Sequence, residues 1–188
     1  MPDRPGSRSL ARLSGVTQER LAELGRGIGQ VMRAGDVLVL NGPLGAGKTT
    51  LTRSLGEGLE VRGPVTSPTF VLARTHPSLV GGAPLVHVDA YRLTEGIELD
   101  DLDLDIEGSA TVIEWGRDWA QLLTDQWVQI DLQPEPTLAD VDAAPDADPD
   151  AAPAETRRVT ITAHRLDAAP DHALPTDDFA ARVESLLS

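Results

Sequence analysis

Short apolar runs rich in β-branched residues alternate along the chain with segments in which apolar residues recur every three or four positions. The runs predict buried strands, and the periodic segments predict amphipathic helices. This alternation is typical of an α/β domain, in which helices pack on a sheet. We expect strands at 9–13, 36–41, 70–74, 85–89, 110–114, 127–132 and 158–163, and helices at 17–35, 49–59, 117–123 and 177–187.

The last two predicted strands are expected to pair as a hairpin around an unusual connection. The segment 134–156 has 23 residues, of which five are proline, seven are alanine, seven are acidic and none is basic. Such a composition buries too little apolar surface to offset the entropy lost on ordering. We therefore expect a single domain over 1–188 that carries a disordered acidic loop at 134–156 and a short C-terminal helix at 177–187.

A glycine-rich stretch, Gly-Pro-Leu-Gly-Ala-Gly-Lys-Thr at 42–49, joins the second predicted strand to a helix. It matches the P-loop pattern Gly-x-x-x-x-Gly-Lys-Thr at every specified position. Gly42, Gly45 and Gly47 allow a tight turn and a close approach of the backbone to an anion. The loop N–H groups and the helix N-terminus then offer donors and partial positive charge to phosphate. The motif predicts a three-layer P-loop NTPase fold with a mixed, mainly parallel central sheet.

The side chains of the motif supply the rest of a nucleotide site. Lys48 is expected to reach the β- and γ-phosphates, and the Thr49 hydroxyl is expected to ligate Mg²⁺. Lys48 is the only lysine of the chain, whose other fifteen basic residues are all arginine, and a compact ammonium suits a position among phosphate oxygens. The residues predicted to contact the nucleotide are Gly42, Leu44, Gly45, Ala46, Gly47, Lys48, Thr49 and Thr50.

Two of the later predicted strands end in an acid, 85–89 in Asp89 and 110–114 in Glu114. Ligands of open α/β sheets bind outside the carboxyl ends of the strands. In a chain with a P-loop, both acids are therefore candidates for the Mg²⁺ shell or for orienting water. His87 lies in the middle of the first of these strands and is interpreted as a packed histidine rather than a ligand.

The passage before the third predicted strand holds a second hydroxyl-bearing segment. Pro68 restricts Ser67 to an extended conformation, which fixes how Thr69 is presented. Thr69 either faces a γ-phosphate or Mg²⁺, as ordered threonines of nucleotide switches do, or belongs to a plain turn that leads into a strand. The residues alone favour the turn.

Net charge and composition exclude several classes of protein. The charge of −14, from 16 basic and 30 acidic residues, argues against strong direct nucleic-acid binding by this chain alone. No apolar run reaches the length of a membrane span, the N-terminus lacks the apolar block of a secretory signal, and the absence of cysteine removes disulfides and thiolate metal sites. We expect a cytoplasmic protein that does not enter membranes.

Four blocks, in this order and at these distances, resemble the TsaE family: 44–50 in the P-loop, then 67–70, 87–93 and 112–115. A P-loop alone occurs in very many proteins, whereas the four blocks together are specific. The resemblance covers roughly residues 9–132 and resumes at 158–164. It leaves out the acidic loop and the C-terminal segment.

The resemblance implies a small regulatory ATPase that uses ATP with Mg²⁺ and forms ADP. It also implies two partner proteins, TsaB and TsaD, with which the family works in making threonylcarbamoyladenosine in tRNAs that read codons beginning with A. The chain would act on tRNA through that complex and would not itself transfer the carbamoyl group. The roles implied by matching blocks are Lys48, Asp89 and Glu114 as catalytic, Thr49 and Glu114 as metal-binding, Trp115 as nucleotide-binding, and Ser67 and Thr69 as switch-like.

Other functions compete with this one. A small-molecule kinase shares the P-loop but needs an acceptor pocket and an arginine-bearing lid, and Arg117 is the only arginine between Arg92 and Arg157. A nucleotide-dependent binding module would bind nucleotide with negligible turnover. A GTPase is disfavoured because its base-reading Asn-Lys-x-Asp motif needs a lysine, and Lys48 is already the lysine of the P-loop.

Overall fold

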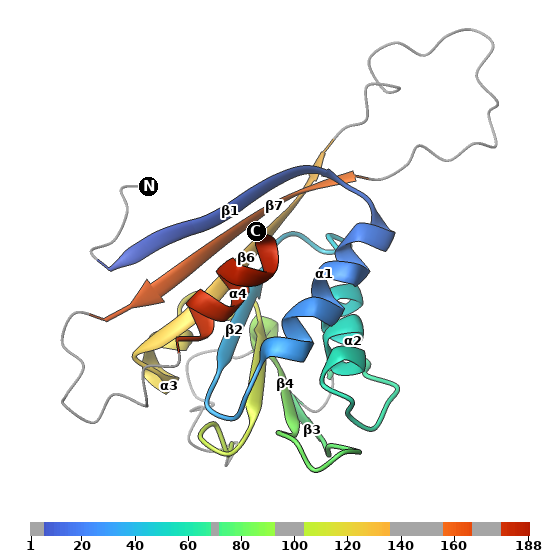
Figure 1. The fold of residues 1–188 in the computed structure, drawn as a ribbon, viewed down its shortest axis with the longest axis vertical. Helices are drawn as coiled ribbons and strands as arrows, with labels where there is room; N and C mark the ends of the chain where they lie inside the picture. Colours follow the sequence, from blue (N-terminus) through green and yellow to red (C-terminus); the bar gives the residue numbers. More distant parts are fainter. Residues whose placement is uncertain (1–5, 69–71, 93–103, 136–155, 167–177) are drawn as a thin grey trace, which may run out of the picture.

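The structure, a computed structural model, describes residues 6–68, 72–92, 104–135, 156–166 and 178–188. Those residues form one seven-stranded sheet in the order β1-β7-β6-β2-β5-β4-β3, with helices packed on it (Figure 1). The strands are β1 (Ser7–Val16), β2 (Val37–Asn41), β3 (Ala73–His76), β4 (Leu85–Asp89), β5 (Ala110–Glu114), β6 (Gln126–Glu135) and β7 (Thr156–Arg165). The helices are α1 (Gln18–Val31), α2 (Lys48–Gly58), α3 (Ala120–Leu123), α4 (Phe179–Leu187) and the 3₁₀ turn η1 (Ala90–Arg92).

The sheet is mixed, as the sequence predicts. The central strands β6, β2, β5 and β4 are parallel to one another. β7 is antiparallel to both β6 and β1, and β3 is antiparallel to β4. Five strands therefore point one way and two, β3 and β7, point the other way, which confirms the mainly parallel sheet and the predicted hairpin between β6 and β7.

The two faces of the sheet carry unequal layers. Figure 1 shows α1, α2 and α4 on the same face, where Leu21, Leu55 and Val183 help to form the larger core. On the other face, the short α3 contributes to a smaller core with Val39 and Val86. β2 is buried along its whole length because it supplies side chains to both cores, which explains its unbroken apolar run. The three-layer α/β prediction is confirmed.

Several predicted boundaries need correction. β1 runs over ten residues instead of the predicted five because its antiparallel ladder with β7 continues through polar positions. β3 begins at Ala73, and the predicted start at 70 lies outside the described residues. Only the last four residues of the predicted helix 117–123 are helical, as α3. Helix α1 starts after the N-cap Thr17, as predicted, but ends at Val31, several residues before Gly35.

The predicted acidic loop is also too wide at both ends. Pro134 and Glu135 belong to β6, and Thr156 belongs to β7, where it pairs with Glu135. Glu135 is held there because its carboxylate accepts the Gly15 N–H at 2.7 Å and pairs with Arg158 at 2.9 Å. Residues 136–155 lie outside the described part of the chain, so their predicted disorder stays a prediction.

The predicted C-terminal helix is present as α4, from Phe179 onward. Its N-cap is Asp178, whose carboxylate accepts the Ala180 N–H at 3.0 Å, and residue 177 lies outside the described ranges. None of the helices in the described ranges is both long and apolar enough to cross a bilayer.

Candidate functional site

The glycine-rich loop leaves the end of β2 and enters α2, in the strand–loop–helix order that its motif requires. Gly42, Gly45 and Gly47 have φ values of 144°, 79° and 105°, a region that side chains with a Cβ rarely adopt. At Gly42 a Cβ would also lie 2.3 Å from the Leu132 carbonyl oxygen. The glycines are therefore required by the shape of the loop itself.

Helix α2 begins without a side-chain cap, since its N-cap is Gly47. The first N–H groups of a helix have no intrahelical partner, and the helix dipole adds partial positive charge at the same end. This end of α2 opens onto a cavity of about 680 Å³, a volume within the usual range for small-molecule sites. The cavity is lined by Pro43, Leu44, Gly45, Gly47, Lys48, Thr49, Thr50, Ser67, Asp89, Tyr91, Glu114 and Trp115.

Lys48 is held at this cavity in a desolvated position. Its side chain is buried, its Nζ donates to the carbonyls of Gly42 at 2.8 Å and Pro43 at 3.0 Å, and it lies 3.9 Å from the centre of the Trp115 ring. Burial lowers the pKa of the ammonium, whereas the charges of Glu114 and Asp89 raise it. The group is thus a buried cation poised next to an open volume.

The two strand-end acids lie on adjacent parallel strands, directly opposite each other in register. Both are buried, and each accepts hydrogen bonds that fix its carboxylate. Glu114 Oε1 accepts from the Thr49 hydroxyl at 3.2 Å. Asp89 accepts the Tyr91 N–H at 3.1 Å and the Ser67 hydroxyl at 3.5 Å. The structure therefore gathers both acids at the mouth of the P-loop, as the topology of β4 and β5 predicts.

His87 is a packed histidine, as predicted, but it also touches the site. The ring is fully buried within β4, and its Nε2 lies 2.9 Å from Glu114 Oε1. Since a carboxylate only accepts, Nε2 carries the proton in this contact. His87 thus shares with Thr49 the task of orienting Glu114.

Trp115 follows Glu114 in an unusual backbone conformation. Its φ is 62°, which is uncommon for a non-glycine residue and concentrates at functional sites. The turn directs the indole over Lys48, and Tyr91 packs against the indole with ring centroids 5.1 Å apart. Tyr91 and Leu44 remain mostly exposed, 67% and 94% respectively. The cavity is therefore bordered by apolar surface as well as by charge.

The predicted site residues fall into three groups. Most of them line the cavity together. Gly42 and Ala46 are not among the lining residues. Gly42 lies against the Leu132 backbone, and Ala46 is 1% exposed. Thr69 lies outside the described residues, so its switch-like role remains a prediction, whereas Ser67 lies beside Asp89.

Sequence reasoning missed three residues around the loop. Tyr91 lay in a quoted block but was given no role, and the contact of His87 with Glu114 depends on strand register. Arg157, at the start of β7, is buried and donates from Nε to the Ala46 carbonyl at 2.8 Å. No local signal marks Arg157, because it is 111 positions from its partner.

The oxygen ligands at this end of the sheet fit a magnesium ion. Thr49 Oγ1 and Glu114 Oε1 lie 3.2 Å apart, and Mg²⁺ prefers hard oxygen donors, with one or two from protein and the rest from phosphate and water. Within the described ranges, no group of three or more His, Cys, Asp or Glu side chains is arranged to hold a metal. Two protein oxygens beside an open cavity fit a Mg²⁺ ion whose other ligands are phosphate oxygens and water.

Comparison with known proteins agrees with this geometry. A family model described as "Threonylcarbamoyl adenosine biosynthesis protein TsaE" matches residues 16–139. The "tRNA threonylcarbamoyladenosine biosynthesis protein TsaE" of Streptomyces coelicolor is 58% identical over 113 residues, covering 58% of this chain and 76% of that protein. The protein of the same name from Mycobacterium leprae is 42% identical over 134 residues, covering 65% of this chain and 83% of that protein.

A solved structure shares the fold over almost the whole chain. The crystal structure of YdiB from Bacillus subtilis superposes with a TM-score of 0.66 at 23% identity, covering 96% of this chain and 95% of that one. At this identity the likeness supports the fold alone. The match of the family model to 16–139 and the identities of the two bacterial relatives carry the assignment further, and the chain belongs to the TsaE family.

Proposed function

We propose that this chain binds Mg·ATP at the cavity, hydrolyses it slowly to ADP, and thereby supports TsaB- and TsaD-like partners in forming threonylcarbamoyladenosine in tRNAs that read codons beginning with A. The relatives it resembles are named for tRNA threonylcarbamoyladenosine biosynthesis. The observation that carries the proposal is the buried ammonium of Lys48, held on loop carbonyls beside an open cavity.

Phosphate binding would follow from groups already in place. The uncapped N-terminus of α2 offers N–H donors, and Lys48 would exchange the carbonyls of Gly42 and Pro43 for phosphate oxygens. This exchange is favourable because charge-assisted bonds to an anion are stronger than bonds to neutral carbonyls. The burial that lowers the pKa of Lys48 also strengthens its attraction to a phosphate, since the surrounding dielectric is low.

Thr49 and Glu114 would hold the magnesium ion. In phosphoryl transfer Mg²⁺ bridges phosphate oxygens and neutralises charge that develops on them. The role of this chain is to keep the two oxygen atoms converged, and His87 assists by fixing Glu114 Oε1 from the core side. These two oxygen atoms would supply two of the six ligands of an octahedral Mg²⁺.

Asp89 is proposed to orient the attacking water. Its carboxylate is buried and anchored by the Tyr91 N–H and the Ser67 hydroxyl, so its remaining lone pairs have a fixed direction. A fixed carboxylate can hold a water molecule in line for attack and accept its proton. The contact with Ser67 also links this acid to the segment that continues to Thr69.

Slow turnover by the isolated chain, and its stimulation by partners, are both part of the proposal. No arginine is among the described residues that line the cavity. Arg117 pairs with Asp131 at 2.7 Å, and Arg53 donates to the Val65 carbonyl at 3.4 Å. P-loop sites that gain a positive group from a partner accelerate by about 10³-fold or more. We therefore assign stimulation to the TsaB- and TsaD-like partners.

The test is phosphate release by the purified chain, with and without both partners from the same organism. The proposal expects slow release by the chain alone and a gain of about 10³-fold with the partners, the scale that a supplied cation can produce. Nucleotide binding with no release under either condition would instead support a binding module. Fast release that the partners leave unchanged, with transfer to an added metabolite, would support a kinase.

Location is part of the same proposal. A protein that supports modification of cytoplasmic tRNA should itself be cytoplasmic. Cell fractionation followed by immunodetection would check this, and recovery in the membrane fraction would contradict it.

A further inference from the structure

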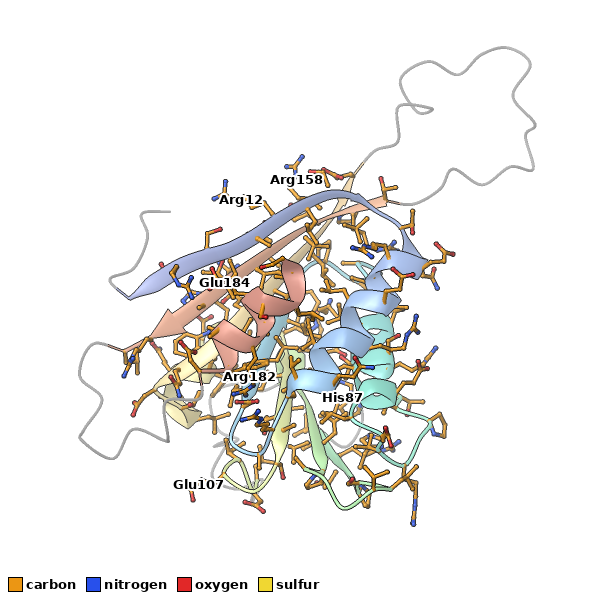
Figure 2. All side chains as sticks on the ribbon, viewed as in Figure 1. Arg12, His87, Glu107, Arg158, Arg182 and Glu184 are labelled. Carbon is orange, nitrogen blue, oxygen red and sulfur yellow. The ribbon has the colours of Figure 1, made fainter. Side chains whose placement is uncertain are left out.

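Arg157 is the second residue of β7, opposite Val16 on β1 and Pro134 on β6. Alternation along the strand directs its side chain to the inner face, where it is 6% exposed. The next residue, Arg158, points outward, as Figure 2 shows, with 60% of its side chain exposed beside Glu135. Two adjacent arginines thus have opposite environments, and burying the first one requires a reason because a desolvated guanidinium is costly.

The reason lies in the phosphate loop. Arg157 Nε donates to the carbonyl oxygen of Ala46 at 2.8 Å. The same nitrogen lies 3.2 Å from the position that a Cβ on Gly47 would take, with Leu21 at 2.7 Å on that side. The arginine therefore packs directly against the backbone of the Ala46–Gly47 peptide, in addition to bonding it.

The hydrogen bond to the Ala46 carbonyl also fixes the direction of the Gly47 N–H. The peptide unit is planar and trans, so the C=O of Ala46 and the N–H of Gly47 point in opposite directions. Holding the oxygen against β7 therefore directs the Gly47 N–H the other way. Gly47 lines the cavity and Ala46 does not. Gly47, whose φ is 105°, has no Cβ to restrict its backbone, so this peptide can rotate unless another contact holds it.

We propose that Arg157 is a positioning residue of the phosphate loop, which fixes the Ala46–Gly47 peptide so that the Gly47 N–H faces the nucleotide phosphates. The inference rests on the proposed function for its ligand. It connects the β6–β7 hairpin, which the P-loop motif does not include, to phosphate recognition through one hydrogen bond.

Two substitutions separate the hydrogen bond from charge and bulk. Arg157→Gln places its amide Nε2 the same number of bonds from Cα as the arginine Nε, so it keeps the donor and loses the charge. Arg157→Met keeps a similar chain and has no donor. Arg158→Met is the matched control, since that neighbour lies outside the cavity and the loop.

The experiment is calorimetric titration of each purified variant with Mg·ADP. Arg157→Met should bind about 10-fold more weakly than the native chain, the effect of one positioned hydrogen bond. Arg157→Gln and Arg158→Met should stay within about 3-fold of the native chain. Equal affinity for Arg157→Met and the native chain would overturn the inference, as would an Arg157→Gln variant as weak as Arg157→Met.

A nucleotide-free readout separates this inference from the proposed function. In ¹H–¹⁵N spectra of the apo protein, the Gly47 amide should shift in Arg157→Met and return toward its native position in Arg157→Gln. An unmoved Gly47 amide in Arg157→Met would overturn the inference. If the Gly47 amide responds to the two substitutions as expected but the native chain does not bind Mg·ADP, the proposed function is overturned and the positioning role is supported. If Arg157→Met does not fold, native affinity and a native Gly47 amide in Arg157→Gln still support the role, and their loss overturns it.

Discussion

Strand β2 has buried charge at both of its ends, and the two ends use that charge differently. Just before its start, Asp36 forms a largely buried ion pair with Arg182 of α4, with side chains 12% and 13% exposed. Arg182 also donates from Nε to the Val31 carbonyl at 2.9 Å. The labelled Arg182 in Figure 2 points from α4 toward this turn. The pair joins α4 to the connection between α1 and β2.

At the other end of β2, the buried cation has no such partner. Among the described residues, no carboxylate forms an ion pair with Lys48, whose Nζ donates to two loop carbonyls. The acids Asp89 and Glu114 line the same cavity as Lys48. A closed ion pair serves the fold, whereas a desolvated cation beside open volume is arranged for a ligand.

Lys48→Met should have the largest effect, a loss of ligand binding without a loss of stability. Two charge-assisted contacts to phosphate are lost, so affinity for Mg·ATP should fall by about 1000-fold. The melting temperature should stay the same or rise, because burial lowers the pKa of Lys48 and the charged form therefore opposes folding. Calorimetry and thermal unfolding measure the two quantities. If Lys48→Met bound Mg·ATP as tightly as the native chain but melted at a lower temperature, Lys48 would serve the fold rather than the ligand.

Arg182→Met should do the opposite, lowering stability by about 3 kcal/mol at neutral pH because it leaves a buried carboxylate unpaired. Burial already raises the pKa of Asp36, against the opposing effect of Arg182. The folded state therefore takes up the proton before the unfolded state as pH falls, and protonation removes the unpaired charge. The loss of stability should be smaller at about pH 5 than at about pH 7.

Urea unfolding at the two pH values measures this effect, and Mg·ATP affinity should match the native chain. The double variant Asp36→Asn, Arg182→Met is the control, since it has no carboxylate to protonate. A pH-independent loss in Arg182→Met would show that packing, rather than the ion pair, holds α4.

Glu114→Gln and Asp89→Asn test the acids on the ligand side. Each should lower ATP turnover by about 100-fold, the usual scale for a positioned acid or base, while changing affinity much less. Trp115 offers the affinity measurement, because a phosphate that draws Lys48 off its ring, now 3.9 Å away, should change its fluorescence. Native turnover in both variants would show that the strand-end acids do not act on water or metal.

The smallest effect is expected from the β6–β7 connection. The ladder ends with Glu135 directly opposite Thr156, so a two-residue glycine-containing turn can close it. Replacing 136–155 by such a turn should leave the melting temperature within a few degrees and Mg·ATP affinity unchanged. A larger drop would mean that the replaced residues pack on the domain.

Local patterns were enough to predict most of the fold and the outline of the site. The apolar run of β2, the glycines of its loop and the acids ending β4 and β5 are each readable within a few residues. Their convergence follows from the rule that ligands bind at the carboxyl ends of parallel strands. This is why the sequence predicts Lys48 and Glu114 at one site.

What could not be predicted depends on register and distance in the chain. The bond from His87 to Glu114 exists because β4 and β5 pair in one register out of several. Arg157 reaches Ala46 across 111 positions. The length of β1 depends on its pairing with β7, since its alternation of polar and apolar residues is weak. Local propensity carries no information about such contacts.

The most direct test of the central claim is thermal unfolding of the native chain, Lys48→Met and Arg182→Met, each with and without saturating Mg·ATP. A ligand stabilises only the state that binds it, by an amount set by its affinity. Nucleotide should raise the melting temperature of the native chain and of Arg182→Met by similar amounts, and that of Lys48→Met not at all. An undiminished nucleotide shift in Lys48→Met, or its loss in Arg182→Met, would contradict the division of roles between the two ends of β2.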